Sequence, residues 1–331
     1  MVPVGIAGKK HAMNITGIEK IIYGVEDLDA AVRYHTDWGL ALANRDDNGA
    51  DFTLADASRL ALRRADDGLL PPATIEWLHF GGSTVREVIW AAADGQTLDA
   101  IGAELGRDRD VTEDSGGVLH TTDDQGYHIG FAVSGLREQH LALPEINTVG
   151  TTGRWNKPAE ASLRRRIRPL RYVHVVYWVP GDTAAAIRFY TDRLGFVITD
   201  TMTLGGAFLR CAGTRDHHNL FLQKSNEGFY GFQHVAYEVK DLDEVGMLGE
   251  FMEEAGWKTN VGPIRHNICS SFSWYLWNPA GGCVEVLSDI DHCGADWQVR
   301  TIDPRDPSFY GHSWSARPEH RGVRPAQWIE D

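Results

Sequence analysis

Residues 172–179 read YVHVVYWV and residues 232–239 read FQHVAYEV. Each octapeptide has the length and apolar character of a buried strand, and each carries a histidine at its third position, His174 and His234. Burying an imidazole among Val, Tyr and Trp is costly unless its nitrogens find partners. A third apolar run, residues 282–287 (GCVEVL), places Glu285 between two valines. Two histidines and one carboxylate can share one metal ion, and this is the ligand set of non-haem Fe(II) oxygenases.

The strand that carries His174 has a counterpart earlier in the chain. Residues 18–25 align over 172–179 without a gap, and a helix-like run follows each of them. Residues 126–133 (GYHIGFAV) align over 232–239, which places His128 over His234. A unit of one strand, one helix and further strands is therefore expected near residues 18, 126, 172 and 232. This repeat predicts an α+β protein of two similar domains, each made of two modules.

The repeat and the intervening polar stretches predict five segments. They are a leader over 1–15, an N-terminal domain over 16–135, a linker over 136–168, a C-terminal domain over 169–290 and an arm or lid over 291–331. The pattern predicts helices that begin at Asp182 and Asp241, because aspartate caps helix N-termini well, and Gly195 can end the first of them.

The two halves differ at the candidate ligand positions. The first half has Lys20 where the second has His174, and a protonated lysine is a poor metal ligand. His128 takes the place of His234, and only Leu141, Leu143 and Pro144 lie where a counterpart of Glu285 is expected. We therefore expect the N-terminal domain to bind no metal and His128 to be a core residue.

Composition excludes several classes of protein. The formal net charge of the 331 residues is −14, which disfavours nucleic acid and anionic membrane surfaces as partners. No apolar run approaches the ~20 residues of a membrane span. The four cysteines form no CxxC pair and no secretory signal is evident, so we expect reduced thiols in a cytoplasmic protein. We also expect a homo-oligomer.

Several motifs together resemble a known family. The paired modules, the strands HVVYWV and QHVAYEV, the helix end DRLGF and the segment NPAGGCVEV are similar to the vicinal-oxygen-chelate (glyoxalase/bleomycin-resistance/dioxygenase) superfamily. Within it, the second half resembles type I extradiol ring-cleavage dioxygenases, closely over 169–290 and weakly over 16–135. The resemblance implies domains of paired βαβββ modules that form cupped mixed sheets. The metal ligands of the family fall on His174, His234 and Glu285.

Three further positions match the family by spacing. A histidine that precedes an apolar strand falls on His218, 44 residues after His174. Another falls on His266 and a tyrosine on Tyr275, 19 and 10 residues before the glutamate. The resemblance implies acid–base work on oxygen species for His218, and hydrogen bonds to the substrate oxygens for His266 and Tyr275. Strand alternation turns the neighbouring His217 away from His218, and which of the two faces the site stays open.

The resemblance implies cleavage of a catechol-type aromatic beside its diol with both atoms of O2, in aromatic catabolism. Fe(II) is expected in preference to Mn(II). Alternation places Tyr172, Val176 and Trp178 on the face of His174, and Phe232 on that of His234. We expect the substrate to contact Val176, Trp178, Trp274 and Arg265. Val261 stands where some relatives that cleave acidic catechols carry an arginine, so a carboxylate-bearing ring is less favoured, and Arg265 remains the candidate counter-ion for such a ring.

Two other functions belong to the same superfamily. One is a metal-dependent lyase or isomerase of the glyoxalase or epimerase kind, which transfers protons without O2. The other is a non-enzymatic protein that sequesters drugs. The set of His218, His266 and Tyr275 favours oxygen chemistry over the first alternative, and an intact ligand set favours it over the second.

Overall fold

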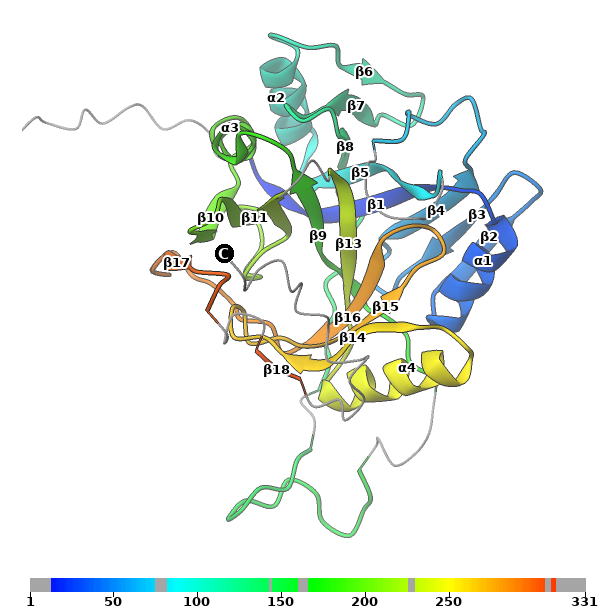
Figure 1. The fold of residues 1–331 in the computed structure, drawn as a ribbon, viewed down its shortest axis with the longest axis vertical. Coiled ribbons are helices and arrows are strands. Elements are labelled where there is room, and N and C mark those ends of the chain that lie inside the picture. Colours follow the sequence, from blue (N-terminus) through cyan, green and yellow to red (C-terminus); the bar gives the residue numbers. More distant parts are fainter. Residues whose placement is uncertain are drawn as a thin grey trace, which may run out of the picture.

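The strands of the protein form two mixed sheets, one of eight strands and one of ten. The computed structural model describes residues 13–74, 82–142, 145–159, 166–225, 230–306 and 311–313. Figure 1 shows the N-terminal sheet, in blue and cyan, beside the C-terminal sheet, in green to orange. The predicted fold class, two domains that each contain paired βαβββ modules, is confirmed.

The N-terminal sheet has the strand order β2-β3-β4-β1-β5-β8-β7-β6. Its first module comprises β1 (Ile15–Val25), α1 (Leu28–Asp37), β2 (Ala41–Arg45), β3 (Gly49–Thr53) and β4 (Arg59–Arg64). Its second module comprises β5 (Thr84–Ala92), α2 (Gly95–Leu105), β6 (Thr112–Glu113), β7 (Leu119–Thr122) and β8 (His128–Val133). The modules join where β1 and β5 pair antiparallel.

The C-terminal sheet has the strand order β17-β10-β11-β12-β9-β13-β16-β15-β14-β18. Its first module comprises β9 (Arg171–Val179), α3 (Thr183–Arg188), the π-helical turn η2 (Phe189–Arg193), β10 (Val197–Met202), β11 (Gly206–Arg210) and β12 (Leu220–Lys224). Its second module comprises β13 (Gly231–Glu238), α4 (Leu242–Glu254), β14 (Thr259–Arg265), β15 (Phe272–Trp277) and β16 (Cys283–Ser288). Two short strands of the tail, β17 (Arg300–Ile302) and β18 (His312–Ser313), extend its edges.

The second N-terminal module begins at β5, and the prediction that it begins near residue 126 is wrong. β8 pairs parallel with β5 in the way that β16 pairs parallel with β13, so residues 128–133 form the last strand of their module. The predicted match of His128 with His234 is therefore wrong as well. The β5 sequence TVREVIWAA has no histidine, and this change hid the repeat.

Strand register identifies the N-terminal counterparts of the candidate ligands. They are Lys20, Glu87 and Gly130, in the positions of His174, His234 and Glu285. Glu87 is buried, and its Oε1 lies 2.8 Å from Nδ1 of His120 on β7. A lysine, a glutamate paired with histidine and a glycine thus replace the ligand set.

Each α-helix is capped by the aspartate that precedes it, including the predicted Asp182 and Asp241. The Asp241 carboxylate accepts from the backbone N–H of Glu244, 3.0 Å away. Gly195 has a left-handed φ of +73° just after η2, as predicted for the helix end. These caps satisfy donors that a helix start leaves without partners.

Aromatic side chains join the two domains into one continuous core. The ring of Tyr23 on β1 packs edge-on against Phe232 on β13, with centroids 5.8 Å apart. Trp90 on β5 packs edge-on against Phe196, with centroids 5.1 Å apart. The C-terminal sheet is thus supported from behind by the N-terminal domain.

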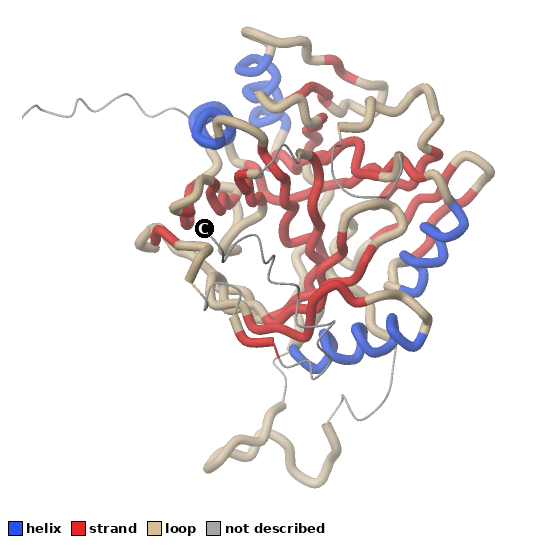
Figure 2. Tube along the Cα trace, in the orientation of Figure 1, coloured by secondary structure: helices blue, strands red, loops and turns tan. Residues whose placement is uncertain are grey.

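The segments outside the sheets are partly described. Residues 145–159 run away from the body as a loop (Figure 2). The tail expected to form an arm contributes β17 to the edge of β10 and β18 to the edge of β14. Residues 1–12, Leu143, Pro144 and the stretch 314–331 lie outside the described residues. No helix in the described part of the chain is long and apolar enough to cross a membrane.

Candidate metal centre

The three candidate ligands lie on adjacent strands in the middle of the C-terminal sheet. His174 is on β9, His234 on β13 and Glu285 on β16. Ala236 pairs with His174 on one side and with Glu285 on the other, so these residues form one row across the sheet. His234 lies two residues before Ala236 on the middle strand. Strand pairing therefore brings the three ligands together, although His174 and Glu285 are more than 100 residues apart in the sequence.

Their ligand atoms converge with nearly equal spacing. Nε2 of His174 lies 3.1 Å from Nε2 of His234 and 3.0 Å from Oε2 of Glu285, and Nε2 of His234 lies 3.2 Å from the same oxygen. Two ligand atoms about 2.1 Å from a metal ion and at right angles to each other lie about 3.0 Å apart. The spacing thus fits three neighbouring corners of an octahedron, which leaves three corners on the opposite side open.

The proton positions also indicate a cation at this point. The Gln233 amide donates through Nε2 to Oε1 of Gln223, so its own Oε1 is the atom that lies 2.5 Å from Nδ1 of His234. Nδ1 must then carry the proton, and Nε2 of His234 presents a lone pair to the Glu285 carboxylate. With His234 neutral, two electron-rich atoms lie 3.2 Å apart, an arrangement that a cation bound by both would stabilise. The residues present therefore fit a divalent metal ion.

Glu285 is the most buried of the three, with 1% of its surface exposed. Burial opposes its ionisation, but hydrogen bonds and charge interactions with His174 and His234 lower its pKa well below the usual range. Burial lowers the pKa of His174. An ionised carboxylate beside neutral imidazoles is the protonation state that metal binding requires. Among the described residues, this is the only convergent group of three or more His, Cys, Asp or Glu side chains.

The three other predicted catalytic residues surround this group. The His218 ring stacks on that of His174, with centroids 4.1 Å apart. Tyr275 pairs directly with Glu285 across β15 and β16, and its hydroxyl lies 2.8 Å from Nε2 of His266. Burial and the charge of Glu285 raise the pKa of Tyr275, which keeps it a phenol that can donate a hydrogen bond.

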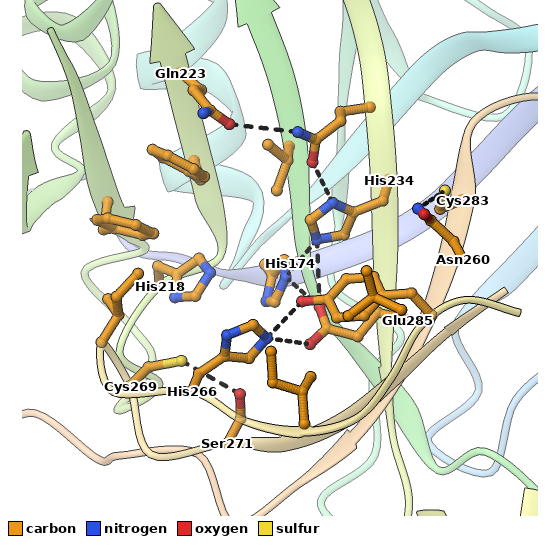
Figure 3. A pocket seen from close by; sticks show the side chains of 18 of the residues that line it. His174, His218, Gln223, His234, Asn260, His266, Cys269, Ser271, Cys283 and Glu285 are labelled. Carbon is orange, nitrogen blue, oxygen red and sulfur yellow. Dashed lines mark hydrogen bonds and ion pairs between the residues drawn. The ribbon is translucent and has the colours of Figure 1, made fainter. Parts of the chain in front are cut away.

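The site opens into a cavity of about 270 Å³, slightly smaller than the roughly 300–1,000 Å³ usual for small-molecule sites. Figure 3 shows His174, His218, His234, His266 and Glu285 among the side chains that line it. Apolar and aromatic side chains form much of the remaining wall: Val176, Trp178, Phe208, Phe221, Val261, Ile264 and Ile268. Three amides add polarity: Gln223, Gln233 and Asn260. Such a wall suits a small flat molecule with few polar groups.

Two predicted substrate contacts do not line the cavity. Trp274 precedes Tyr275 on β15, so it faces the other side of the sheet, where it packs on Gly249 of α4. Arg265 forms an ion pair with Asp289, 2.6 Å away, and is directed away from the site. Val176 and Trp178 do line the cavity as expected.

β-bulges change the predicted faces of two strands. The register between β9 and β13 shifts between Phe232 and His234 and again between Ala236 and Tyr237. Phe232 and Tyr172 consequently turn toward the interior of the protein, where both join the main core. The first bulge brings Gln233 into the cavity beside His234, a contact that strict alternation cannot predict.

His217 and His218 do not lie within a strand, as alternation assumed, but in the bend before β12. His218 lines the cavity, whereas His217 is fully buried behind it and lies 2.8 Å from Asp200. Only His218 faces the cavity, but the two rings are in contact through their Nδ1 atoms, 3.0 Å apart, so the prediction that they point to opposite faces is wrong.

Comparisons with known proteins place this architecture in a family. The model of the Glyoxalase/Bleomycin resistance protein/Dioxygenase superfamily matches residues 171–273. Metapyrocatechase 2 of Cupriavidus necator is 30% identical over 216 residues, which cover 65% of this chain and 66% of that protein. The chain therefore spans about two thirds of the length of this relative.

Solved structures match over more of the chain. The homoprotocatechuate 2,3-dioxygenase from Arthrobacter globiformis superimposes with a TM-score of 0.70 at 17% identity, covering 96% of this chain and 92% of that one. The Mn(II)-bound glyoxalase from Novosphingobium aromaticivorans superimposes with a TM-score of 0.68 at 23% identity, covering 90% of each chain. The chain belongs to the Glyoxalase/Bleomycin resistance protein/Dioxygenase superfamily. The first of these structures carries the name of a dioxygenase and the second that of a glyoxalase.

Proposed function

We propose that the protein is an extradiol dioxygenase that cleaves a catechol-type aromatic beside its diol with O2. The observation that carries this proposal is the convergence of His174, His234 and Glu285 within 3.2 Å of one another on the wall of the aromatic cavity. His174 Nε2, His234 Nε2 and Glu285 Oε2 would hold Fe(II). When bound, the ion lowers the pKa of the diol hydroxyls and supplies neighbouring positions for the diol and O2.

The protein side chains bind and orient the substrate. The walls formed by Val176 and Trp178 pack on the flat ring, and burial of this surface excludes water from the reacting atoms. The phenol of Tyr275 is placed to donate a hydrogen bond to a substrate oxygen, and its contact with His266 holds the two groups together. We expect their loss to reduce turnover more than substrate binding.

His218 is the acid–base group of the proposal. Its ring stacks on His174, so it stands beside the metal ligands and not among them. Burial and the neighbouring His174 lower its pKa well below the usual range, which keeps the imidazole neutral. A neutral imidazole has a lone pair on one ring nitrogen and a proton on the other. A positioned acid–base group contributes about 10²–10⁴-fold to a rate.

Oxygen uptake with a panel of catechols, followed together with the visible spectrum, tests this function. We expect one O2 consumed per catechol and a yellow ring-opened product. His234→Ala should lose iron and activity together, whereas the matched variant His128→Gln, in the other domain, should keep both. Full turnover in His234→Ala would refute the proposal. Turnover of a substrate without O2 uptake would instead assign a lyase or isomerase, and reconstitution with Mn(II) alone would identify the preferred ion.

A further inference from the structure

A buried chain of polar groups leads from the cavity to the C-terminal tail. Nδ1 of His218 lies 3.0 Å from Nδ1 of His217, and Nε2 of His217 lies 2.8 Å from Oδ2 of Asp200. His217 and Asp200 are fully buried and His218 is 4% exposed. Neither His217 nor Asp200 lines the cavity. Fully buried polar groups require partners, so this chain is a defined part of the structure.

Asp200 is held as an acceptor by Arg300. The Arg300 side chain donates through Nε and Nη2 to the Asp200 carboxylate, with Nη2 2.5 Å from Oδ2, and its backbone N–H donates to Oδ1 at 2.8 Å. Burial opposes ionisation of Asp200, but the hydrogen bonds from His217 and Arg300 lower its pKa. An ionised carboxylate has no proton to donate.

This acceptor determines every proton position along the chain. Because Asp200 only accepts, the 2.8 Å contact requires a proton on Nε2 of His217. A neutral His217 then has a lone pair on Nδ1, so His218 must donate through its own Nδ1–H. The remaining nitrogen of His218, Nε2, is left with a lone pair.

We propose that Asp200 and His217 are positioning residues that hold His218 as the Nδ1–H tautomer, so that its Nε2 is a proton acceptor in the active-site cavity. The part of this inference that concerns catalysis rests on the proposed function. The tautomer itself follows from the hydrogen bonds of a neutral His217 with Asp200 and His218. A histidine with the opposite tautomer would present an N–H to the substrate and could not accept its proton.

The tail takes part in this arrangement through β17. Arg300 pairs with Asp200 in the register of β10 and β17, and Trp297 donates through Nε1 to the carbonyl of Thr199 at 3.1 Å. The Trp297 ring packs edge-on against His217. Residues 297–302 therefore fix the position of the Asp200 carboxylate and favour its charged form. This role is more specific than the arm or lid that was expected for the tail.

Nitrogen NMR of the metal-free protein tests the tautomer directly, because protonated and unprotonated imidazole nitrogens have well-separated ¹⁵N shifts. We expect His217 protonated on Nε2 and His218 protonated on Nδ1. In Asp200→Asn the amide oxygen stays with Arg300 and the NH2 group turns to His217, so both tautomers should reverse. A wild-type His218 protonated on Nε2 would overturn the inference.

Kinetics of the iron-loaded enzyme tests the consequence. In Asp200→Asn we expect kcat to fall by about 10²–10⁴-fold with KM for catechol little changed, as for removal of an acid–base group. If Asp200→Asn does not fold, His217→Phe, which keeps a ring in place, is the second variant. It should show the same fall in kcat with KM for catechol little changed. Thr301→Val is the matched control, since it removes the 3.1 Å contact with Thr201 on the same strand pair and should keep kcat.

These outcomes separate the two proposals. Unchanged kcat in both variants would overturn the positioning role. A wild-type enzyme without ring-cleaving activity, but with the expected ¹⁵N shifts, would refute the proposed function and leave the tautomer assignment supported.

Discussion

The buried carboxyl group of Asp123 joins the two domains. It lies in the turn between β7 and β8, accepts a hydrogen bond from the hydroxyl of Tyr190 at 2.8 Å and is 4% exposed. The same turn carries Tyr127, whose hydroxyl donates to the carbonyl of Trp178 on β9 and accepts from the N–H of Gly231 on β13. Burial raises the pKa of Asp123 to about 6, although its hydrogen bonds lower it in part.

A raised pKa means that the folded protein resists ionisation of Asp123. Between its ordinary value of 3.8 and about 6, unfolding releases a proton, so stability falls as the pH rises through this range. The free-energy cost is about 1.6 kcal/mol at pH 5 and about 3 kcal/mol at pH 8. Asp123→Asn cannot ionise and escapes this cost.

Urea unfolding of wild type and Asp123→Asn at pH 5, 6.5 and 8 measures the effect. The variant should gain about 1.4 kcal/mol relative to wild type between pH 5 and pH 8, whatever constant offset its altered hydrogen bonds cause. Asp124→Asn is the matched control, because this neighbour is exposed and pairs with Arg109, and its effect should stay below about 1 kcal/mol at each pH. A stability difference between Asp123→Asn and wild type that is independent of pH would refute the reasoning.

Three other substitutions test the packing around the domains. Burial lowers the pKa of His35 to about 4, so the contribution of this residue to wild-type stability should fall by about 2 kcal/mol between pH 7.5 and pH 5, as the unfolded chain takes up a proton and against the opposite contribution of Asp123. His35→Gln should lose less in the same urea titration, and an equal loss would contradict this account. A Cβ on Gly249 of α4 would lie 2.3 Å from Trp274, so Gly249→Ala should destabilise by about 1–3 kcal/mol. Gly246→Ala in the same helix meets no atom within 4 Å and should stabilise by about 0.5–1 kcal/mol; equal effects of the two on thermal unfolding would show that helix propensity, not Trp274, decides the outcome.

The sequence was sufficient to predict the fold class and the convergence of three side chains. The apolar strands contain His174, His234 and Glu285, and a polar group without a partner is costly there. This cost can be recognised from the sequence. The start of the second N-terminal module was predicted at the wrong place because β5 retains the strand pattern but carries Glu87 in place of histidine. No histidine remained in the matching position to align the repeat.

The orientation of several site residues could not be predicted. Alternation assigns faces only to regular strands, and two bulges on β9 and β13 turned Phe232 and Tyr172 inward while bringing Gln233 to the cavity. The contact of Asp200 with His217 joins β10 to the bend before β12, and Arg300 reaches it from another 100 residues along the chain. No motif or spacing in the sequence near these residues predicts a contact between such distant segments.

The central claim is that one divalent ion binds between His174, His234 and Glu285. Calorimetric titration of the metal-free protein with Fe(II) under nitrogen tests it most directly. We predict one ion per chain for wild type and an affinity at least about 100-fold lower for Glu285→Gln, since loss of a direct ligand should cost no less than loss of its supporting hydrogen bonds. A wild-type protein that binds no ion, or a Glu285→Gln variant that binds it equally well, would contradict the account.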